Sequence, residues 1–461
     1  MKFILFKEMI THMLHNKRLS GTQIIMIGFL AIILLGGILL FLPFSNKGGI
    51  TFTDALFTSV TATCITGLIT VDTYSAYTTF GHIIILLLIQ TGGLGFISVA
   101  ALFSITMGKK IGIRERMLIS ESLSLSETSG IIRLMRFIIA VTFIIEFIGA
   151  LILTLCFVPE FGLAGGIFKG IFHSVSAFCN AGLDLMGERE PFSSFTAYNR
   201  LGMYNVVVNI TLCALIVIGG LGFSVWSDLY YYRKNKRLRL HTKIVLITTA
   251  ALIVCGAAAF TVFEWNNPGT IGNMRISEKI MAGISQSVFA RTAGFNTVDL
   301  AEIRKQSVLL ECMLMFIGGS PGSTAGGLKT TVIAVIILTA LSVVRGRDEV
   351  FVFGRRISKK LRLRALAILF MSVCIILIGI FILCICDDVE FEQIVFEVIS
   401  AFATTGITMG ITTTLSLPAK ITLMILMYLG RVGILTTGYA IARQQNFGEK
   451  VISYPKEDIL M

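Results

Sequence analysis

Residues Phe52–Gly67, with the sequence FTDALFTSVTATCITG, form a stretch that recurs in altered form three more times along the chain. Its first part, Phe52–Ala62, is semi-apolar and too short to cross a bilayer, which takes about 20 residues. It ends in the turn Thr63–Gly67. The stretch therefore predicts a short re-entrant or interfacial helix that is followed by a glycine-containing turn.

Three later stretches repeat this arrangement. The short segments are Ile167–Phe178, Ser277–Ala290 and Phe391–Ala403. The turns after them end in Gly182, Gly294 and Gly406, so that the four glycines recur every 115, 112 and 112 residues. A second glycine group follows each turn by 25, 37, 24 and 24 residues; the groups begin at Gly92, Gly219, Gly318 and Gly430. Two registers that agree across four units indicate an internal fourfold pseudo-symmetry.

Long apolar runs flank each short segment. Hydrophobic residues make up 55% of the 461 residues and charged residues 14%, against about 25% in soluble domains, which excludes a soluble enzyme. The runs are Thr22–Leu42, His82–Met107, Arg133–Val158, Leu201–Ser227, Thr242–Phe263, Ser307–Val343, Leu366–Cys386 and Pro418–Ala442. The sequence therefore predicts an all-α polytopic membrane protein. It is expected to consist of four covalently linked repeats, each made of a spanning helix, a short pore helix and a second spanning helix. The eight spanning helices would surround a central cation pore.

Basic residues predict the orientation of these spans. Both termini and the loops on their side hold 27 Lys and Arg, whereas the segments with the short helices hold ten, together with 14 acidic residues. Cytoplasmic loops carry the excess of Lys and Arg, so both termini are expected in the cytoplasm and an acidic vestibule outside. This distribution accounts for the net charge of +12 without nucleic acid binding. The predicted parts are a cytoplasmic lead (1–20), four pore repeats (21–107, 108–228, 229–343, 344–443) and a cytoplasmic tail (444–461).

The glycine turns suit an ion path. A dehydrated cation needs oxygens in place of water, and a ring of backbone carbonyls supplies them without placing charge in the membrane. Glycine permits the dihedral angles that point successive carbonyls inward, and the C-terminal end of each short helix favours a cation. The predicted filter and ion-binding residues are Ile65, Thr66, Gly67, Asn180, Ala181, Gly182, Thr292, Ala293, Gly294, Thr404, Thr405 and Gly406. The alternative, glycines that only let helices pack closely, fits the second glycine groups better than the regularly spaced turns.

The third unit departs from the others within Ser307–Val343. This run exceeds one crossing and contains proline and clustered glycines, which cost about 3 and about 1 kcal/mol each in a helix. Non-helical backbone at that depth must line a cavity, and its flexibility suits a gate; a kink without a gating role is the alternative. The candidate gating residues are Gly318, Gly319, Ser320, Pro321, Gly322, Ser323, Thr324, Ala325, Gly326, Gly327 and Lys329.

Arg431 is a second asymmetry. It occupies the register of three glycines in the other units, Gly93, Gly220 and Gly319. A charge within a span costs at least about 2.5 kcal/mol and usually marks a functional position. We therefore expect Arg431 to take part in gating, as an electrostatic barrier below the filter or as a tether for the candidate gating segment. A structural ion pair with Glu311 or Glu146 is the alternative.

In these features the chain resembles the Trk/Ktr/HKT superfamily of potassium transporters, and within it the Ktr-type ion-translocating membrane subunit. The resemblance covers essentially the whole chain and rests on four units with single-glycine filters, on the interruption Gly318–Lys329 and on Gly430–Gly433. It implies potassium uptake across the cytoplasmic membrane by a channel-like subunit, with a potassium ion as the transported substrate and no covalently bound cofactor. It also implies a homodimer on a ring of cytosolic nucleotide-binding regulatory subunits of the KtrA or KtrC type.

Other readings of the sequence stay open at this stage. Within transport, the alternative is a sodium-selective or weakly selective cation pore, and sodium dependence is a further open point. Gly67 favours potassium. In the superfamily that the chain resembles, sodium-selective members look as though they have serine in place of the first filter glycine. A membrane enzyme would need converging catalytic groups, and an alternating-access carrier predicts inverted repeats, whereas these repeats are parallel. The basic cluster Arg355–Arg364 is expected to contact membrane lipid, with a docking surface for an acidic cytosolic partner as the alternative.

Overall fold

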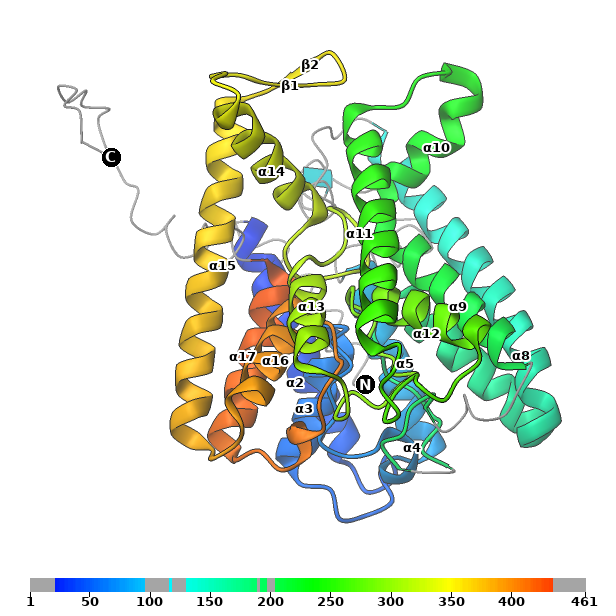
Figure 1. The fold of residues 1–461 in the computed structure, drawn as a ribbon. Coiled ribbons are helices and arrows are strands. Elements are labelled where there is room, and N and C mark those ends of the chain that lie inside the picture. Colours follow the sequence, from blue (N-terminus) through cyan, green and yellow to red (C-terminus); the bar gives the residue numbers. More distant parts are fainter. Residues whose placement is uncertain (1–20, 96–115, 118–129, 189–190, 197–203, 434–461) are drawn as a thin grey trace.

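The computed structural model describes residues 21–95, 116–117, 130–188, 191–196 and 204–433. Helices dominate this part of the chain, and a single two-stranded hairpin is the sheet found within it (Figure 1). The prediction of a mostly helical protein with several apolar helices is therefore confirmed. The predicted lead (1–20) lies outside the described residues, as does the predicted tail (444–461).

The first unit contains one long helix, two further helices and a single turn of helix. These are α2 (Gly21–Phe41), α3 (Phe52–Thr63), α4 (Thr73–Ala76) and α5 (Thr79–Leu94). The short helix α3 begins with a capping box, in which Asp54 N donates to Thr51 Oγ1 at 3.2 Å and the Asp54 carboxylate accepts from Thr51. α5 ends at Gly95, whose φ of +82° lies outside the helical region. The predicted span His82–Met107 is thus described only as far as Gly95.

The second unit has a bend that the sequence did not predict. Its helices are α8 (Ile131–Phe178), α9 (Tyr204–Leu221) and α10 (Phe223–Asn235). α8 contains a predicted span and a predicted short helix, joined at the non-helical Gly162. The run Leu201–Ser227 is not one straight span, because the chain turns by 93° between α9 and α10. Gly222 permits the bend with a φ of +98°, which residues with a Cβ rarely adopt.

The last two units complete the element order. The third contains α11 (Leu240–Glu264), α12 (Ile276–Phe289), α13 (Lys305–Phe316) and α14 (Thr330–Val344). The antiparallel hairpin β1 (Val350–Val352) and β2 (Arg355–Ile357) follows. The fourth contains α15 (Lys359–Cys386), α16 (Phe391–Ala403), the 3-10 turn η2 (Ile411–Thr413) and α17 (Leu417–Val432). The long apolar run of the third unit is interrupted between α13 and α14, where the sequence places proline and clustered glycines.

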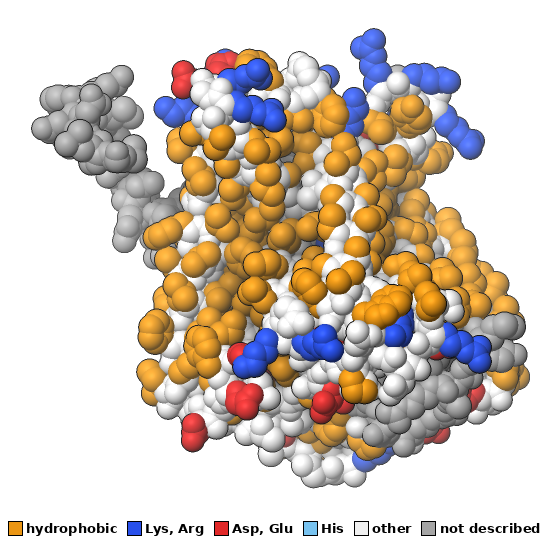
Figure 2. Space-filling view, in the orientation of Figure 1, with side chains coloured by type: hydrophobic (Ala, Val, Ile, Leu, Met, Phe, Trp, Pro, Cys, Tyr) orange, Lys and Arg blue, Asp and Glu red, His pale blue; other side chains and the backbone are white. Residues whose placement is uncertain are grey.

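The surface carries a hydrophobic belt. Figure 2 shows apolar side chains over the middle of the visible face. Lys and Arg gather at the end that holds the hairpin and α10, with some Asp and Glu beside the hairpin, and both acidic and basic side chains lie toward the opposite end. Large apolar side chains of the long helices are strongly exposed, such as Phe147 of α8 at 70% and Phe370 of α15 at 71%. In the described residues, four helices are long and apolar enough to cross a membrane: α2, α8, α11 and α15. A contiguous apolar surface of this extent fits contact with lipid.

The first and last units pack against each other. One hydrophobic core combines Phe57 and Val60 of α3 with Phe402 of α16 and Leu423 of α17. The hydroxyl of Tyr428 donates to the carbonyl oxygen of Met26 at 2.8 Å, which joins α17 to α2. The chain therefore closes on itself, and the four short helices point their C-terminal ends toward a common region.

Candidate functional site

Four glycine turns meet at the centre of the molecule. They are Ile65–Gly67, Asn180–Gly182, Thr292–Gly294 and Thr404–Gly406, and are called the glycine turns below. A Cβ on Gly67 would lie 2.8 Å from Ala181 O, and one on Gly182 would lie 2.6 Å from Ala293 O. A Cβ on Gly406 would overlap Thr66 O. The structure thus brings the twelve predicted filter residues together, with each glycine backbone against a neighbouring turn.

Each turn has the same unusual backbone. The four glycines have φ values of +98°, +67°, +73° and +89° in chain order. The residue two positions earlier is also left-handed in every turn: Ile65 (+53°), Asn180 (+59°), Thr292 (+63°) and Thr404 (+53°). This conformation is an outlier for β-branched residues, and such strain collects at functional sites. These four residues were predicted as filter residues, but their left-handed backbone was not, because only asparagine carries a recognisable signal for it.

The second glycine groups serve close packing, as predicted. Gly92, Gly219 and Gly430 lie so close to the ends of the short helices that a Cβ would overlap a carbonyl oxygen. These oxygens belong to Thr63, Phe178 and Phe402, each four residues before the glycine of its turn. The second helix of each of these units therefore presses on the point where the short helix ends and the glycine turn begins.

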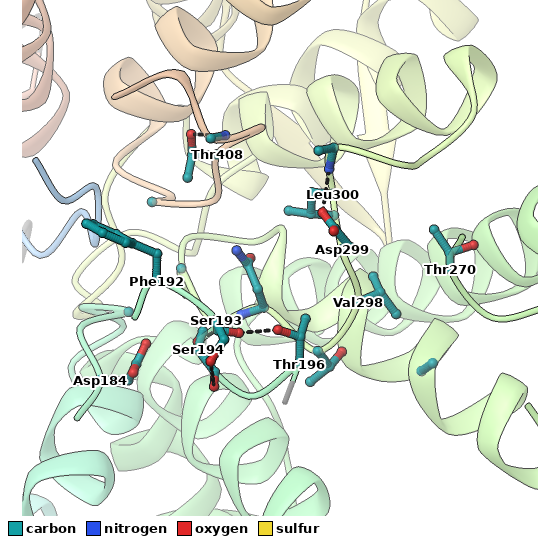
Figure 3. A pocket seen from close by; sticks show the side chains of 18 of the residues that line it. Asp184, Phe192, Ser193, Ser194, Thr196, Thr270, Val298, Asp299, Leu300 and Thr408 are labelled. Atoms are coloured by element: carbon teal, nitrogen blue, oxygen red, sulfur yellow. Dashed lines mark hydrogen bonds between the residues drawn. The ribbon is translucent and has the colours of Figure 1, made fainter. Parts of the chain in front are cut away.

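A cavity of about 1190 Å³ opens on one side of the glycine turns. All four turn glycines line it. The remaining lining comes from segments that follow the turns and from residues 269–282, which precede the third turn. Figure 3 shows Asp184 and Phe192–Ser194 of the second unit, Asp299 of the third and Thr408 of the fourth around this space. Four carboxylates and one guanidinium line it: Asp72, Asp184, Glu278, Asp299 and Arg275. The cavity is therefore net acidic and suits the concentration of cations.

The carboxylates of the cavity cap backbone amides. Asp184 Oδ1 accepts from Met186 N at 2.9 Å, and Asp299 Oδ1 accepts from Ala301 N at 3.0 Å. Burial raises the pKa of Asp184 to about 6, against the opposing effect of its hydrogen bonds with Met186 N and Ser194. This carboxyl group can therefore change its charge near neutral pH. Among the described residues, no group of three His, Cys, Asp or Glu side chains could hold a metal ion.

The segment Ile317–Lys329, called the interrupting loop below, lies on the other side of the glycine turns. Ser320 N donates to Gly220 O at 3.0 Å, and Phe223 N donates to Gly322 O at 2.8 Å, which fixes the loop to the bend between α9 and α10. Thr324 Oγ1 lies 3.1 Å from Phe178 O, at the start of the second glycine turn. Candidate gating residues of the third unit therefore contact the second unit directly.

The interrupting loop also contacts the fourth unit. A Cβ on Gly326 would overlap Thr404 Oγ1, and one on Gly327 would lie 2.8 Å from Ala403 O. Lys329 Nζ donates back to Ala325 O at 2.7 Å, so the lysine closes the loop on itself. The loop thus fills the space beneath the glycine turns instead of extending away from it.

Arg431 links the interrupting loop to the first unit. Its Nη1 donates to Thr324 O, and its Nη2 donates to Gly92 O and, at 3.2 Å, to Gly93 O. The described ion pairs do not include Arg431 with either Glu146 or Glu311. The guanidinium therefore binds backbone oxygens of the third and the first unit.

Comparison with known proteins identifies the family of the chain. Residues 19–449 match the family model of TrkH, described as a cation transport protein. The chain belongs to the TrkH family of cation transport proteins. This TrkH-family protein is 40% identical to the potassium/sodium uptake protein NtpJ of Enterococcus hirae, over 97% of its own length and 98% of the relative. It is 39% identical to the Ktr system potassium uptake protein B of Bacillus subtilis, over 96% and 97% of the two chains.

A solved structure shows the same fold. The potassium transporter TrkH of Vibrio parahaemolyticus superposes with a TM-score of 0.70 at 18% identity, over 92% of this chain and 85% of that one. Together with the apolar helices, this family membership makes the protein a multi-pass protein of the cell membrane. Its family consists of membrane ion transporters and not of enzymes.

Proposed function

We propose that this TrkH-family protein takes up potassium through a pore whose selectivity filter is the ring of four glycine turns. The observation that carries the proposal is the contact of each turn glycine with a neighbouring turn around one centre. Backbone oxygens at such a centre can replace the water of a cation. The net acidic cavity is then the outer vestibule. Relatives with names of potassium or potassium/sodium uptake proteins support the choice of ion.

The interrupting loop is the gate in this proposal. It lies against the bases of the second and fourth glycine turns, and Arg431 holds Thr324 O from below. A loop that is held by a few hydrogen bonds can leave this position more easily than a helix can. Conduction therefore requires the loop to move. Arg431 tethers the loop, and its positive charge is a barrier to cations in the pore.

The proposal includes an orientation and an assembly. The Lys and Arg of the hairpin and of α10 lie at the end away from the acidic cavity, which supports a cytoplasmic location of that end. The proposal also includes eight spanning helices, an even number that leaves both termini on the same side, the cytoplasm. As relatives are named components of Ktr systems, we include a homodimer on a cytosolic nucleotide-binding ring.

Potassium-limited growth of a host without its own potassium uptake systems tests the function. We expect the chain to restore growth and uptake when a cytosolic regulatory subunit is co-expressed. In purified vesicles, Gly67→Ser should raise sodium permeation relative to potassium, because a side chain at this φ of +98° forces the neighbouring carbonyls apart.

Two outcomes would contradict the proposal. A Gly67→Ser variant with unchanged potassium over sodium selectivity would reject the glycine turns as the filter. Sodium uptake by the unaltered chain at the same rate as potassium uptake would favour the weakly selective cation pore, which is the second candidate because one relative is named a potassium/sodium uptake protein.

A further inference from the structure

Arg291 is a buried arginine directly before the third glycine turn. It is 8% exposed, and its Nη2 donates to Gly318 O of the interrupting loop at 3.4 Å. Its Nε has no hydrogen-bond partner, and the ion pairs of the described residues do not include it. The other units have small residues at this register, namely Cys64, Cys179 and Ala403. A buried cation without a counter-ion is costly, so packing alone does not explain this residue.

The third glycine turn also lacks a clamp that the other turns have. Six residues before the turn glycine, the other short helices carry a hydroxyl. Thr61 Oγ1 accepts from Gly67 N at 2.9 Å, and Ser400 Oγ accepts from Gly406 N at 3.1 Å. Ser176 Oγ donates to Leu183 O at 2.7 Å. The third unit has Val288 at this register, which cannot form such a bond.

A second brace is missing from the third unit as well. Nine residues before the turn glycine, a polar side chain of the short helix binds the chain beyond the turn. The pairs are Tyr77 with Thr58 (3.0 Å), Leu185 N with His173 (3.2 Å), and Thr408 with Glu397 (2.8 Å). The third unit has Ser285 there, and its hydroxyl accepts from Cys213 of α9 instead. The third short helix therefore does not brace its own turn in the way the others do.

The interrupting loop provides the missing support. A Cβ on Gly318 would lie 3.2 Å from Thr292 Cγ2, so the loop backbone packs on the third turn. Arg291 adds a charged hydrogen bond to the same residue. We propose that Arg291 is a positioning residue that couples the third glycine turn to the interrupting loop, so that movement of the loop loosens this turn and lowers selectivity. This inference rests on the proposed function of the turns and the loop.

The test measures potassium flux and the potassium/sodium permeability ratio of the full chain in lipid vesicles. Arg291→Met removes the charge and the donor but keeps most of the volume. We expect it to lower the permeability ratio about tenfold, the effect of one lost charged hydrogen bond, and to raise the flux. Arg291→Lys should restore most of the ratio, since the ammonium can still donate to the loop.

The chain offers a matched control on the helix that precedes Arg291. Lys279 of α12 is 7% exposed, and its Nζ donates to a single carbonyl, that of Trp265, at 2.7 Å, away from the loop. Lys279→Met should leave ratio and flux unchanged. A second variant, Val288→Thr, introduces the hydroxyl of the other units. Combined with Arg291→Met, it should recover the ratio because it braces the turn from its own helix.

Deletion of residues 322–327 separates coupling from a local structural role. The deletion leaves Gly318 but removes the contacts that hold the loop against the second and fourth turns, namely those of Thr324, Gly326 and Gly327. The remaining loop is then no longer held beneath the turns, so the ratio is already low and Arg291→Met should change it no further. An equal additional loss in the shortened chain would overturn the coupling, as would an unchanged ratio of Arg291→Met in the intact chain. Failure of the unaltered chain to transport potassium would reject the proposed function itself.

Discussion

The two sides of the glycine turns carry opposite charge. The cavity side presents four carboxylates, and their oxygens cap backbone amides while their charge faces the open space. The loop side presents Arg431, Arg291 and Lys329, and all three donate to backbone carbonyl oxygens. The difference suggests that one side attracts cations and that the other holds a movable segment in place. The experiments below test each half of this comparison, beginning with the turns that separate the two sides.

The largest effect is expected at the turns themselves. Gly406→Ala places a Cβ on Thr66 O, and alanine is also strained at a φ of +89°. Overpacking and left-handed strain together cost about 3 kcal/mol, so potassium uptake should fall about a hundredfold. Uptake into vesicles measures the loss. Gly410→Ala is the matched control, because its φ is +96° but its Cβ meets no atom within 4 Å. Equal losses in both variants would reject the close approach of the turns.

The loop side predicts the next largest effect. Deletion of residues 322–327 removes the segment that contacts the bend at Gly222 and the base of the second turn. Flux without the regulatory subunit should rise about tenfold, if the open state of the intact protein is a minor one. Gly406→Ala should still lower uptake about a hundredfold in the shortened chain. Uptake that this second change leaves unaltered would mean that ions bypass the glycine turns.

The positive charge of the loop side is tested by Arg431→Gln. The amide keeps a donor for Thr324 O but removes the charge from the path. Removal of about 1 kcal/mol of repulsion should raise potassium flux about fivefold. Lys420→Gln on the same helix is the control, since Lys420 binds Thr413 O on the cavity side. An unchanged or lower flux in Arg431→Gln would reject the barrier and leave only the tether.

The smallest effect is expected from the acidic side. The carboxyl group of Asp184 has a pKa of about 6, so it is charged at pH 7 and mostly neutral at pH 5. Uptake at limiting potassium should therefore fall about twofold as the external pH drops through this range, because the cavity loses one attracting charge. Asp184→Asn should remove this pH dependence.

Asp299→Asn is the control for the pH experiment. It removes a charge from the same cavity, so uptake at limiting potassium should be lower at every pH. Its decline between pH 7 and pH 5 should persist, since Asp184 is still present. If uptake by the Asp299→Asn variant did not depend on pH, the assignment of the pH dependence to Asp184 would be wrong.

The helices and their bounds were easier to predict from the sequence than the bends and contacts between them. The predicted short helix Phe391–Ala403 has the same bounds as α16, and the interruption of the third long run lies where proline and glycines cluster. The bend at Gly222 was not predicted, because the glycine group that begins at Gly219 was interpreted as a helix-packing contact and apolarity does not reveal a turn of 93°. Arg291 was also missed as a functional candidate, since its register, and not its local sequence, makes it unusual.

The sequence by itself determined the four short helices, the glycine at the end of each and the position of the interruption. These features depend on local hydrophobicity, on backbone freedom and on spacing along the chain. All three follow directly from the residue types and their order. Only the tertiary structure decided which oxygens Arg431 binds, since Thr324 O and Gly92 O lie 107 and 339 residues away in the chain. The same holds for the support of the third turn by the interrupting loop. Such contacts arise from the closure of the first unit on the last, and a linear pattern does not contain that geometry.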